Sequence, residues 1–482
     1  MTSISSALRT FFWGAIAALL LTVPALGQDR MPLTTSSNSA KMHFRTALDH
    51  LNNVEVLAAR EAADRALKKD SDFALALLVR GLTSKSFADG ESYIEKAQAR
   101  RSAVTVGERH FIDAVAARRA GDMKRMTTAV KALAETHPRD PDALFMLGQM
   151  HFSMQNAEKT KKTLSRLLEI DSEYAAAYNL LGYRAMYEGE QTEAESMFKT
   201  YVELRPEAPN PYDSLAEYYL KVGNYDDAVA NYMTAYEKDP RYVSAWTRAG
   251  LVMAMNGDVE AGEAEIRKAL VTAQDPEDKR AGYDALANAA LLNDDVERAL
   301  AVLDEAAIWA TTAAPERVTY FKMGEGWVLY EHGRRQEAEA VQQEVQQLID
   351  DGTNISEQLR PYVASRAAMA RAFLAVENED LTTAQKEIAT FQTYAEKTGD
   401  PGDKEVLHEL KGTLAYERGN YDVALEHFAK AGSDPHVHYR AGMACKKLGD
   451  VEQARSYFEK AAMANQPSRS FALIRNRAMG EM

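Results

Sequence analysis

Two histidines near the C-terminus are the residues most suited to metal binding. His436 and His438 follow Asp434, so two imidazoles and one carboxylate lie within a short segment. A protein zinc site uses three or four ligands held in a fixed geometry, which is more than this segment offers. We therefore interpret it as a turn, with His438 on the helix that follows, and we predict no bound metal.

A second group of chemically capable side chains is the adjacent pair Asp226 and Asp227, which follows Gly223-Asn224-Tyr225. A calcium site needs about six to eight oxygen ligands, so two neighbouring carboxylates are too few. Asparagine is a preferred N-cap, and carboxylates are stabilised near the positive end of a helix. The pattern predicts a helix that Asn224 caps.

Sequence motifs of the common catalytic and nucleotide-binding sites are absent. The chain has no G-x-S-x-G elbow, no Walker loop, no dinucleotide-binding glycine triplet and no H-E-x-x-H helix. We expect no catalytic residues and no cofactor, although an enzyme with an unrecognised site stays an alternative. The triplet Asn354-Ile355-Ser356 fits a glycosylation site, which matters only in a host that glycosylates exported proteins.

Composition narrows the class of partner. The 482 residues are 46% apolar and 27% charged, as in ordinary folded proteins. Lys plus Arg number 57 against 71 Asp plus Glu, a formal net charge of -14. This balance argues against nucleic acid and anionic membrane surfaces, which attract basic patches. Cys445 is the single cysteine, so no disulfide can form within the chain.

The N-terminus has the order of elements found in a secretory signal. Arg9 precedes an apolar run over residues 11–25, and small residues up to Gly27 precede a polar segment. The run is shorter than the roughly 20 residues that span a bilayer. We predict a signal peptide over residues 1–27, cleavage near Gly27, and no membrane span afterwards. Gln28 stands where a lipoprotein would have cysteine. The mature protein is then periplasmic or secreted, not a lipoprotein, and begins with a flexible polar leader over residues 28–39.

A period of 34 residues runs through the rest of the chain. Glycine and proline recur at this spacing at Gly121, Gly189, Gly223, Gly257, Pro138, Pro206 and Pro240. Position 155 is the exception in the glycine series, because it holds Gln155. A fixed period of this length is typical of repeat architectures.

The repeats resemble those of the tetratricopeptide repeat family. That family favours small and aromatic residues at set positions of its 34-residue unit, and the unit that starts at Ala175 matches well. It supplies Tyr178, Leu181-Gly182, Gly189, Ala194, Phe198 and Pro206. Units begin near residues 40, 73, 107, 141, 175, 209, 243, 280, 319, 365, 405 and 435.

The apolar positions of each unit form two helical stripes separated by the glycine, which predicts a helical hairpin. One hairpin cannot bury both stripes, so neighbours must stack. We predict an all-α fold, a superhelical α-solenoid of about twelve hairpins that the resemblance implies is right-handed. The expected segments are an array over residues 40–350, C-terminal repeats over 365–466 and a capping helix over 467–482. A longer repeat step makes residues 350–365 a candidate boundary where the array bends or divides.

In the resembled family, ligands lie in a concave groove lined by the first helix of each unit. Transfer of those positions to the units that start at residues 141 to 243 gives a groove of Phe145, Gln149, Phe152, Asn179, Tyr183, Met186, Tyr187, Asp213, Glu217, Leu220, Arg248, Leu251 and Met255. This face is apolar and aromatic, so its residues either pack between repeats or contact a ligand. Asp213 and Glu217 would favour Lys or Arg in that ligand. Of the residues with which some family members clamp a C-terminal carboxylate, only Arg248 is present.

The repeats and the missing catalytic motifs favour a non-catalytic scaffold of the cell envelope that binds a protein or peptide partner. The capping helix is expected to turn Phe471, Leu473 and Ile474 toward the last repeat and its basic residues outward. An alternative is a helical carbohydrate- or nutrient-binding component of an outer-membrane receptor. Such receptors usually carry the lipidated cysteine that is absent here.

Overall fold

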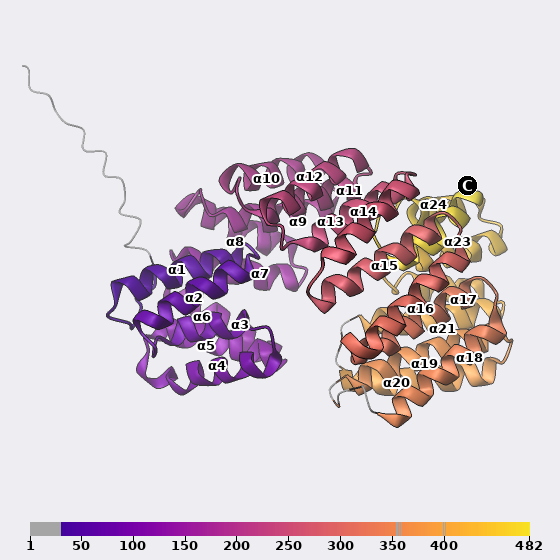
Figure 1. Cartoon of the computed structure of the whole chain (residues 1–482), viewed down its shortest axis with the longest axis horizontal. Coiled ribbons are helices and arrows are strands. Elements are labelled where there is room, and N and C mark those ends of the chain that lie inside the picture. Colours follow the sequence, from indigo (N-terminus) through magenta and orange to yellow (C-terminus); the bar gives the residue numbers. More distant parts are fainter. Residues whose placement is uncertain (1–29, 353–354, 356, 358, 399, 401) are drawn as a thin grey trace, which may run out of the picture. The chain divides into compact units, whose positions relative to one another are not determined.

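The structure, a computed structural model, describes residues 30–352, 355, 357, 359–398, 400 and 402–482. Over these residues the chain is helical and contains no strand, which confirms the predicted all-α fold (Figure 1). The predicted signal peptide over residues 1–27 lies outside the described residues, as do Asn354 and Ser356 of the glycosylation triplet. Among the described helices, none is both long enough and apolar enough to cross a membrane.

Helices begin close to the predicted repeat starts and alternate between a first and a second helix of each hairpin. The first helices are α1 (Asn38–Asn52), α3 (Ala74–Leu82), α5 (Val106–Arg119), α7 (Pro141–Ser153), α9 (Ala175–Glu188), α11 (Pro209–Lys221), α13 (Val243–Met255), α15 (Pro276–Leu292), α17 (Val318–Glu331), α19 (Arg360–Glu377), α21 (Asp403–Glu417) and α23 (Pro435–Leu448).

The second helices follow each first helix after a short turn, and one further helix ends the chain. They are α2 (Val56–Lys69), α4 (Phe87–Ala99), α6 (Met123–Thr136), α8 (Ala157–Ile170), α10 (Gln191–Leu204), α12 (Tyr225–Lys238), α14 (Val259–Thr272), α16 (Val296–Ala313), α18 (Arg335–Asp351), α20 (Leu381–Thr398), α22 (Tyr421–Phe428), α24 (Val451–Ala462) and the final α25 (Arg469–Gly480). The predicted cap of α12 is confirmed, because the Asn224 side chain accepts a hydrogen bond from the backbone N–H of Asp227.

In the described hairpins other than α3–α4, the turn contains one residue with a left-handed backbone. Gly189 has φ of 77° and Gly257 has φ of 101°, as expected of glycine at this position. Gln155 takes the same conformation with φ of 54°, so the turn forms even where the glycine is missing. The hairpin geometry therefore depends on packing as well as on the turn residue.

A second recurring feature of these hairpins is the close crossing of their two helices. A Cβ atom placed on Gly182 would lie 2.8 Å from the ring of Phe198, and one on Gly250 would lie 2.7 Å from Ile266. Normal contacts between carbon atoms are about 3.5–4.0 Å. Glycine at this position therefore lets a large side chain of the second helix fill the space between the two backbones.

The helices form two compact units. Unit 1 comprises residues 56–177 and the chain up to Asn52, which the structure describes from Arg30, and unit 2 comprises residues 53–55 and 178–482. The division falls within α9, and the segment 350–365 lies inside unit 2.

Unit 1 has its own buried core and holds the segment that precedes α1. The side chain of Arg30 donates to Asp142 at 2.9 Å, and the backbone N–H of Thr34 donates to Glu108 at 3.1 Å. Met31 is buried with Phe44 of α1 and other residues of this core. The leader was predicted to be flexible from residue 28. From Arg30 onward it instead packs along the N-terminal ends of α5 and α7, because the acidic residues there match its basic side chain and free backbone donors.

Unit 2 is organised around its first helices. α13 contacts α15, α17 contacts α19, and α19 contacts α21, whereas the second helices each pack mainly on the first helices beside them. We call the side of the first helices that faces away from the second helices the inner surface of unit 2. The main core of the unit runs from α9 to α17 and also includes residues of α25.

Candidate functional site

Polar side chains from three successive first helices meet on the inner surface of unit 2. The hydroxyl of Tyr183 donates to Glu217 at 2.6 Å. The guanidinium of Arg248 donates to Glu217 at 2.8 Å and to Asp213 at 2.9 Å. Residues at equivalent positions of neighbouring repeats are thus brought side by side, although they are 31 to 35 residues apart in the sequence.

These pairs change the prediction that Asp213 and Glu217 attract a basic ligand. Asp213 is buried, and although Arg248 opposes the effect, burial raises the pKa of its carboxyl to about 6. The carboxylates in turn raise the pKa of Arg248 against the opposite effect of its own burial. Arg248 therefore already supplies the cation that the sequence assigned to a ligand, because opposite charges at adjacent slots pair within the protein.

Aromatic residues of α9 have separate roles. Tyr183 is half-buried, and its ring meets the edge of Phe198 at 5.1 Å. Tyr187 is 63% exposed. Asn179 is buried and Met186 packs against the main core. Tyr187 is thus the one of these four predicted groove residues that offers most of its side chain to a partner.

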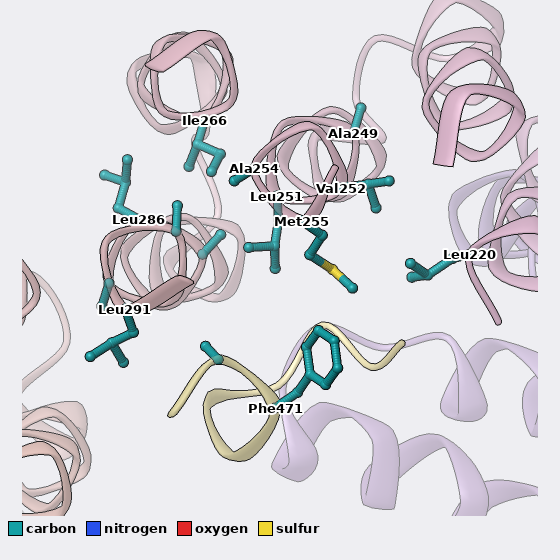
Figure 2. Close-up of a cluster of buried hydrophobic side chains, with 14 of the residues drawn as sticks. Leu220, Ala249, Leu251, Val252, Ala254, Met255, Ile266, Leu286, Leu291 and Phe471 are labelled. Atoms are coloured by element: carbon teal, nitrogen blue, oxygen red, sulfur yellow. The ribbon is translucent and has the colours of Figure 1, made fainter. Parts of the chain in front are cut away.

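Leu220, Leu251 and Met255 were named as groove residues that either pack between repeats or contact a ligand, and all three are buried. Figure 2 shows Phe471 of α25 pointing toward Met255, and the same core contains Leu473 and Ile474. The apolar end of the predicted groove is therefore filled by the chain's own C-terminal helix. Sequence alone gave no sign of this, because α25 follows the last repeat and reaches α15 only through the curvature of unit 2.

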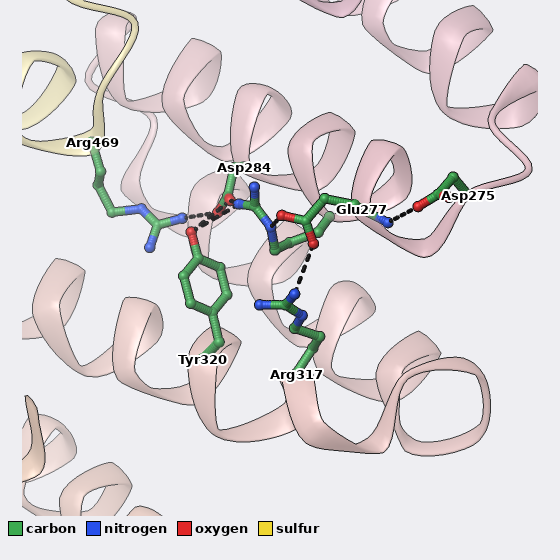
Figure 3. Close-up of polar contacts among 7 residues, drawn as sticks. Asp275, Glu277, Asp284, Arg317, Tyr320 and Arg469 are labelled. Atoms are coloured by element: carbon green, nitrogen blue, oxygen red, sulfur yellow. Dashed lines mark hydrogen bonds and ion pairs between the residues drawn. The ribbon is translucent and has the colours of Figure 1, made fainter. Parts of the chain in front are cut away.

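The basic residues of α25 point into the protein, whereas the sequence analysis expected them to face outward. Arg469 donates to Asp284 of α15 at 2.7 Å, and Tyr320 donates to the same carboxylate at 2.7 Å (Figure 3). Arg475 donates to the backbone carbonyl of Met255 at 2.6 Å. The helix is consequently held by ionic and backbone contacts with the first helices α13 and α15 as well as by apolar packing.

Predicted groove residues of unit 1 divide between core and surface. Phe145 is buried, with its ring 5.2 Å from that of Tyr174. Gln149 is exposed and Phe152 is half-buried. Phe145 therefore serves packing between neighbouring repeats, which was one of the two interpretations left open.

A buried ionic network joins α17, α21, α23 and α25. Nε2 of His436 lies 3.1 Å from Oε1 of Glu331, and Arg477 donates to the other carboxylate oxygen at 2.9 Å. Arg440 pairs with both Glu331 and Glu409. Burial opposes ionisation of both groups, but the neighbouring charges prevail and hold the pKa of Glu331 at about 2 and that of His436 at about 9. His436 is therefore a buried ion-pair partner, which the sequence had placed in a turn.

Beside this network lies a cavity of about 140 Å³ on the inner surface of unit 2. Its walls combine aromatic, apolar and carboxylate side chains from four first helices and one second helix. The lining residues are Tyr330, Val376, Glu377, Thr413, Tyr416, Glu417, Phe428, Arg440 and Met443. This cavity offers a ligand both an open volume and polar groups.

The sequence analysis missed the cavity because it transferred groove positions only as far as the unit that starts at residue 243. Tyr330, Glu377, Tyr416 and Glu417 occupy the late groove positions, 12 or 13, of the units that start at 319, 365 and 405. Extending the transfer would have found them. Irregular repeat steps of 37 and 46 residues made the register there less plain.

Comparisons with known proteins identify the repeats. Models of the tetratricopeptide repeat family match residues 214–279 and 435–467, which correspond to the helices from α11 to the start of α15 and to α23–α24. No curated protein sequence matches the chain significantly.

Similar solved structures cover part of the chain. MamA is 21% identical over 37% of this chain and 97% of that chain, with a TM-score of 0.31. A tetratricopeptide repeat protein from Parabacteroides merdae ATCC 43184 is 15% identical over 59% of this chain and 98% of that chain, with a TM-score of 0.35. YrrB, a TPR protein with an unusual peptide-binding site, is 20% identical over 39% of this chain and 95% of that chain, with a TM-score of 0.30. Similarities of this size carry no information about the partner of this chain.

Proposed function

We propose that this chain, which contains tetratricopeptide repeats, is a non-catalytic scaffold that binds a protein or peptide partner on the inner surface of unit 2. The main support for the proposal is the packing of α25 on the inner surface of unit 2. The first helices of unit 2 hold an amphipathic helix through a combination of apolar burial and paired charges. A surface that holds a helix of its own chain has the shape and chemistry that recognition of a partner segment requires.

The part of this surface left open lies over α17, α19, α21 and α23, where the cavity is found. Tyr330 and Tyr416 stand in its wall, and tyrosine is enriched where proteins bind partners because it combines a large apolar ring with a hydroxyl. We therefore place the partner on the C-terminal repeats, with Tyr187 as a further exposed aromatic residue on α9.

Position-specific crosslinking tests this placement. A photoreactive phenylalanine analogue replaces Tyr416 in the cavity wall, and in a control variant it replaces Val271, which is 80% exposed on the second helix α14. After irradiation of cells of the native host, crosslinked products are identified by mass spectrometry. We expect a defined partner with the Tyr416 variant and not with the Val271 variant. Equal products at both positions would contradict the placement.

We also propose that the protein acts outside the cytoplasm, since the charge, apolar run and small residues before Gln28 are typical of a secretory signal. Fractionation of the host followed by N-terminal sequencing tests this. A mature chain that begins near Gln28 in the periplasm or the medium is the expected result. An intact N-terminus in the cytoplasm would contradict export while leaving the binding surface of unit 2 as proposed.

A further inference from the structure

The cavity between α17, α19, α21 and α23 has an interior suited to an alkyl chain. Tyr330, Tyr416 and Phe428 contribute rings, and Val376 and Met443 contribute aliphatic groups. Its volume of about 140 Å³ compares with about 30 Å³ for one water molecule in the liquid. A narrow apolar space of this size fits a single unbranched side chain and excludes a folded element.

Carboxylates give the same cavity an acidic character. Glu377 and Glu417 both line it, and Glu417 has no hydrogen-bond or ion-pair partner among the described residues. Glu417 is an exposed residue at the edge of the cavity; partial burial and the nearby carboxylates Glu377 and Glu379 raise its pKa, and Lys447 and Arg440 only partly offset this. A cation between these groups would relieve their repulsion and complete the coordination of Glu417.

The cations near the cavity do not fully neutralise its carboxylates. Arg440 lines the cavity, but it pairs with Glu409 and Glu331 and its guanidinium lies 4.6 Å from the centre of the Phe373 ring. Arg335 pairs with one oxygen of Glu377 at 2.7 Å on the side of α18. The acidic groups at the cavity are therefore only partly compensated by the protein.

Tyr330 supplies an independent observation. Its side chain lines the cavity and is half-buried, and its hydroxyl makes no hydrogen bond within the described part of the chain. This hydroxyl can therefore accept a hydrogen bond from a group that enters the cavity. An ammonium group donates hydrogen bonds and accepts none, which matches a hydroxyl oxygen and two carboxylates.

From this geometry we infer that the cavity binds the side chain of a lysine of the partner protein, with its alkyl stem between the rings and its ammonium among Glu377, Glu417 and Tyr330. The inference rests on the proposed function, because it places one residue of the partner on the surface proposed above. Lysine fits better than arginine, since its charge is compact and its stem is slender, whereas the planar guanidinium requires a wider space.

Binding of small probes to the full chain tests the inference directly. The probes are n-butylammonium, the tripeptide acetyl-Gly-Lys-Gly-amide, and the same tripeptide acetylated on the lysine, which removes the charge. Saturation-transfer NMR measures their binding. We expect the first two to bind and the acetylated tripeptide to bind at least about tenfold more weakly, as for the loss of charge-assisted hydrogen bonds.

Matched variants locate the binding. Glu417→Gln and Tyr330→Phe keep the shape of the cavity and should each weaken binding of the tripeptide. Glu426→Gln changes the charge equally on the exposed side of α22 and should leave binding unchanged. Circular dichroism confirms that each variant is folded, and surface Glu-to-Gln changes are normally well tolerated.

Three outcomes would overturn the inference. These are stronger binding of butyrate than of n-butylammonium, binding of n-butylammonium without binding of the lysine tripeptide, and equal effects of Glu417→Gln and Glu426→Gln. The proposed function is tested separately by the crosslinking experiment. A partner that crosslinks at Tyr416 but whose affinity is unchanged by Glu417→Gln would retain the scaffold and remove the lysine site.

Discussion

Replacement of Phe471 by alanine tests whether the C-terminal helix fills the inner surface of unit 2. Phe471 is 1% exposed and shares the main core with Leu251 and Met255 (Figure 2). The guanidinium of Arg475 also lies 5.5 Å from the centre of its ring. Truncation of a buried phenylalanine to alanine costs about 3–5 kcal/mol. We expect a loss of stability within this range, because the ring has almost no contact with solvent.

The loss should appear first as local opening of α25. Terminal helices detach at a lower free energy than the whole domain unfolds, and each 1.4 kcal/mol changes the open population tenfold. We therefore expect backbone amides of α25 to exchange with deuterium about 100-fold faster in Phe471→Ala. Hydrogen exchange with mass spectrometry of the C-terminal peptides measures this, and urea unfolding measures the change for unit 2 as a whole.

Met479→Ala is the matched control, because Met479 lies on the same helix and is 49% exposed. Its effect should stay within about 0.5 kcal/mol, as for most surface substitutions. Unchanged deuterium exchange of the α25 amides in Phe471→Ala would contradict the packing of this helix on the inner surface. Equal effects of the two substitutions would show that the ring is not specifically buried.

Three further predictions concern the helix crossing at Gly250, the tyrosines of α9 and the buried His436. Gly250→Leu should destabilise unit 2 by about 1–3 kcal/mol in chemical denaturation, since a Cβ there would lie 2.8 Å from a backbone oxygen of α14, whereas Gly480→Ala, with open space around it, should change little. Tyr187→Ala should weaken partner binding without a change in melting temperature, while Tyr183→Phe should cost about 1 kcal/mol of stability through loss of its hydrogen bond. The pKa of His436 is raised to about 9 in the folded protein from an ordinary value near 6.5, so its stabilising contribution is complete below pH 6.5 and is lost as pH rises toward 9. Denaturation curves of wild type and His436→Gln should differ most at pH 6 and converge above pH 9, and a constant difference would contradict the assignment.

The sequence was sufficient to predict the hairpins and their order. Spacing of glycines and apolar residues predicted where helices begin, and the starts at residues 141, 175, 209 and 243 coincide with those of α7, α9, α11 and α13. These features depend on contacts between residues close in the sequence. The crossing of Gly250 and Ile266, for example, is encoded within one repeat.

Pairing between neighbouring repeats was only partly accessible from the sequence. The transferred groove positions named Asp213, Glu217 and Arg248 correctly as neighbours on one surface, but they did not show that these charges satisfy one another. That outcome depends on side-chain direction and burial, which a list of repeat positions does not contain.

The tertiary structure alone decided which part of the inner surface is open. Arg475 and Met255 are 220 residues apart, yet they share a hydrogen bond because small rotations between successive hairpins accumulate along unit 2 until α25 meets α13 and α15. The sequence of a single repeat does not determine this accumulated rotation. The same accumulation brings Tyr330, Glu377 and Glu417 around one cavity while it buries Leu251 under Phe471, so the location of the proposed binding surface is a property of the curvature of unit 2 and not of any one repeat.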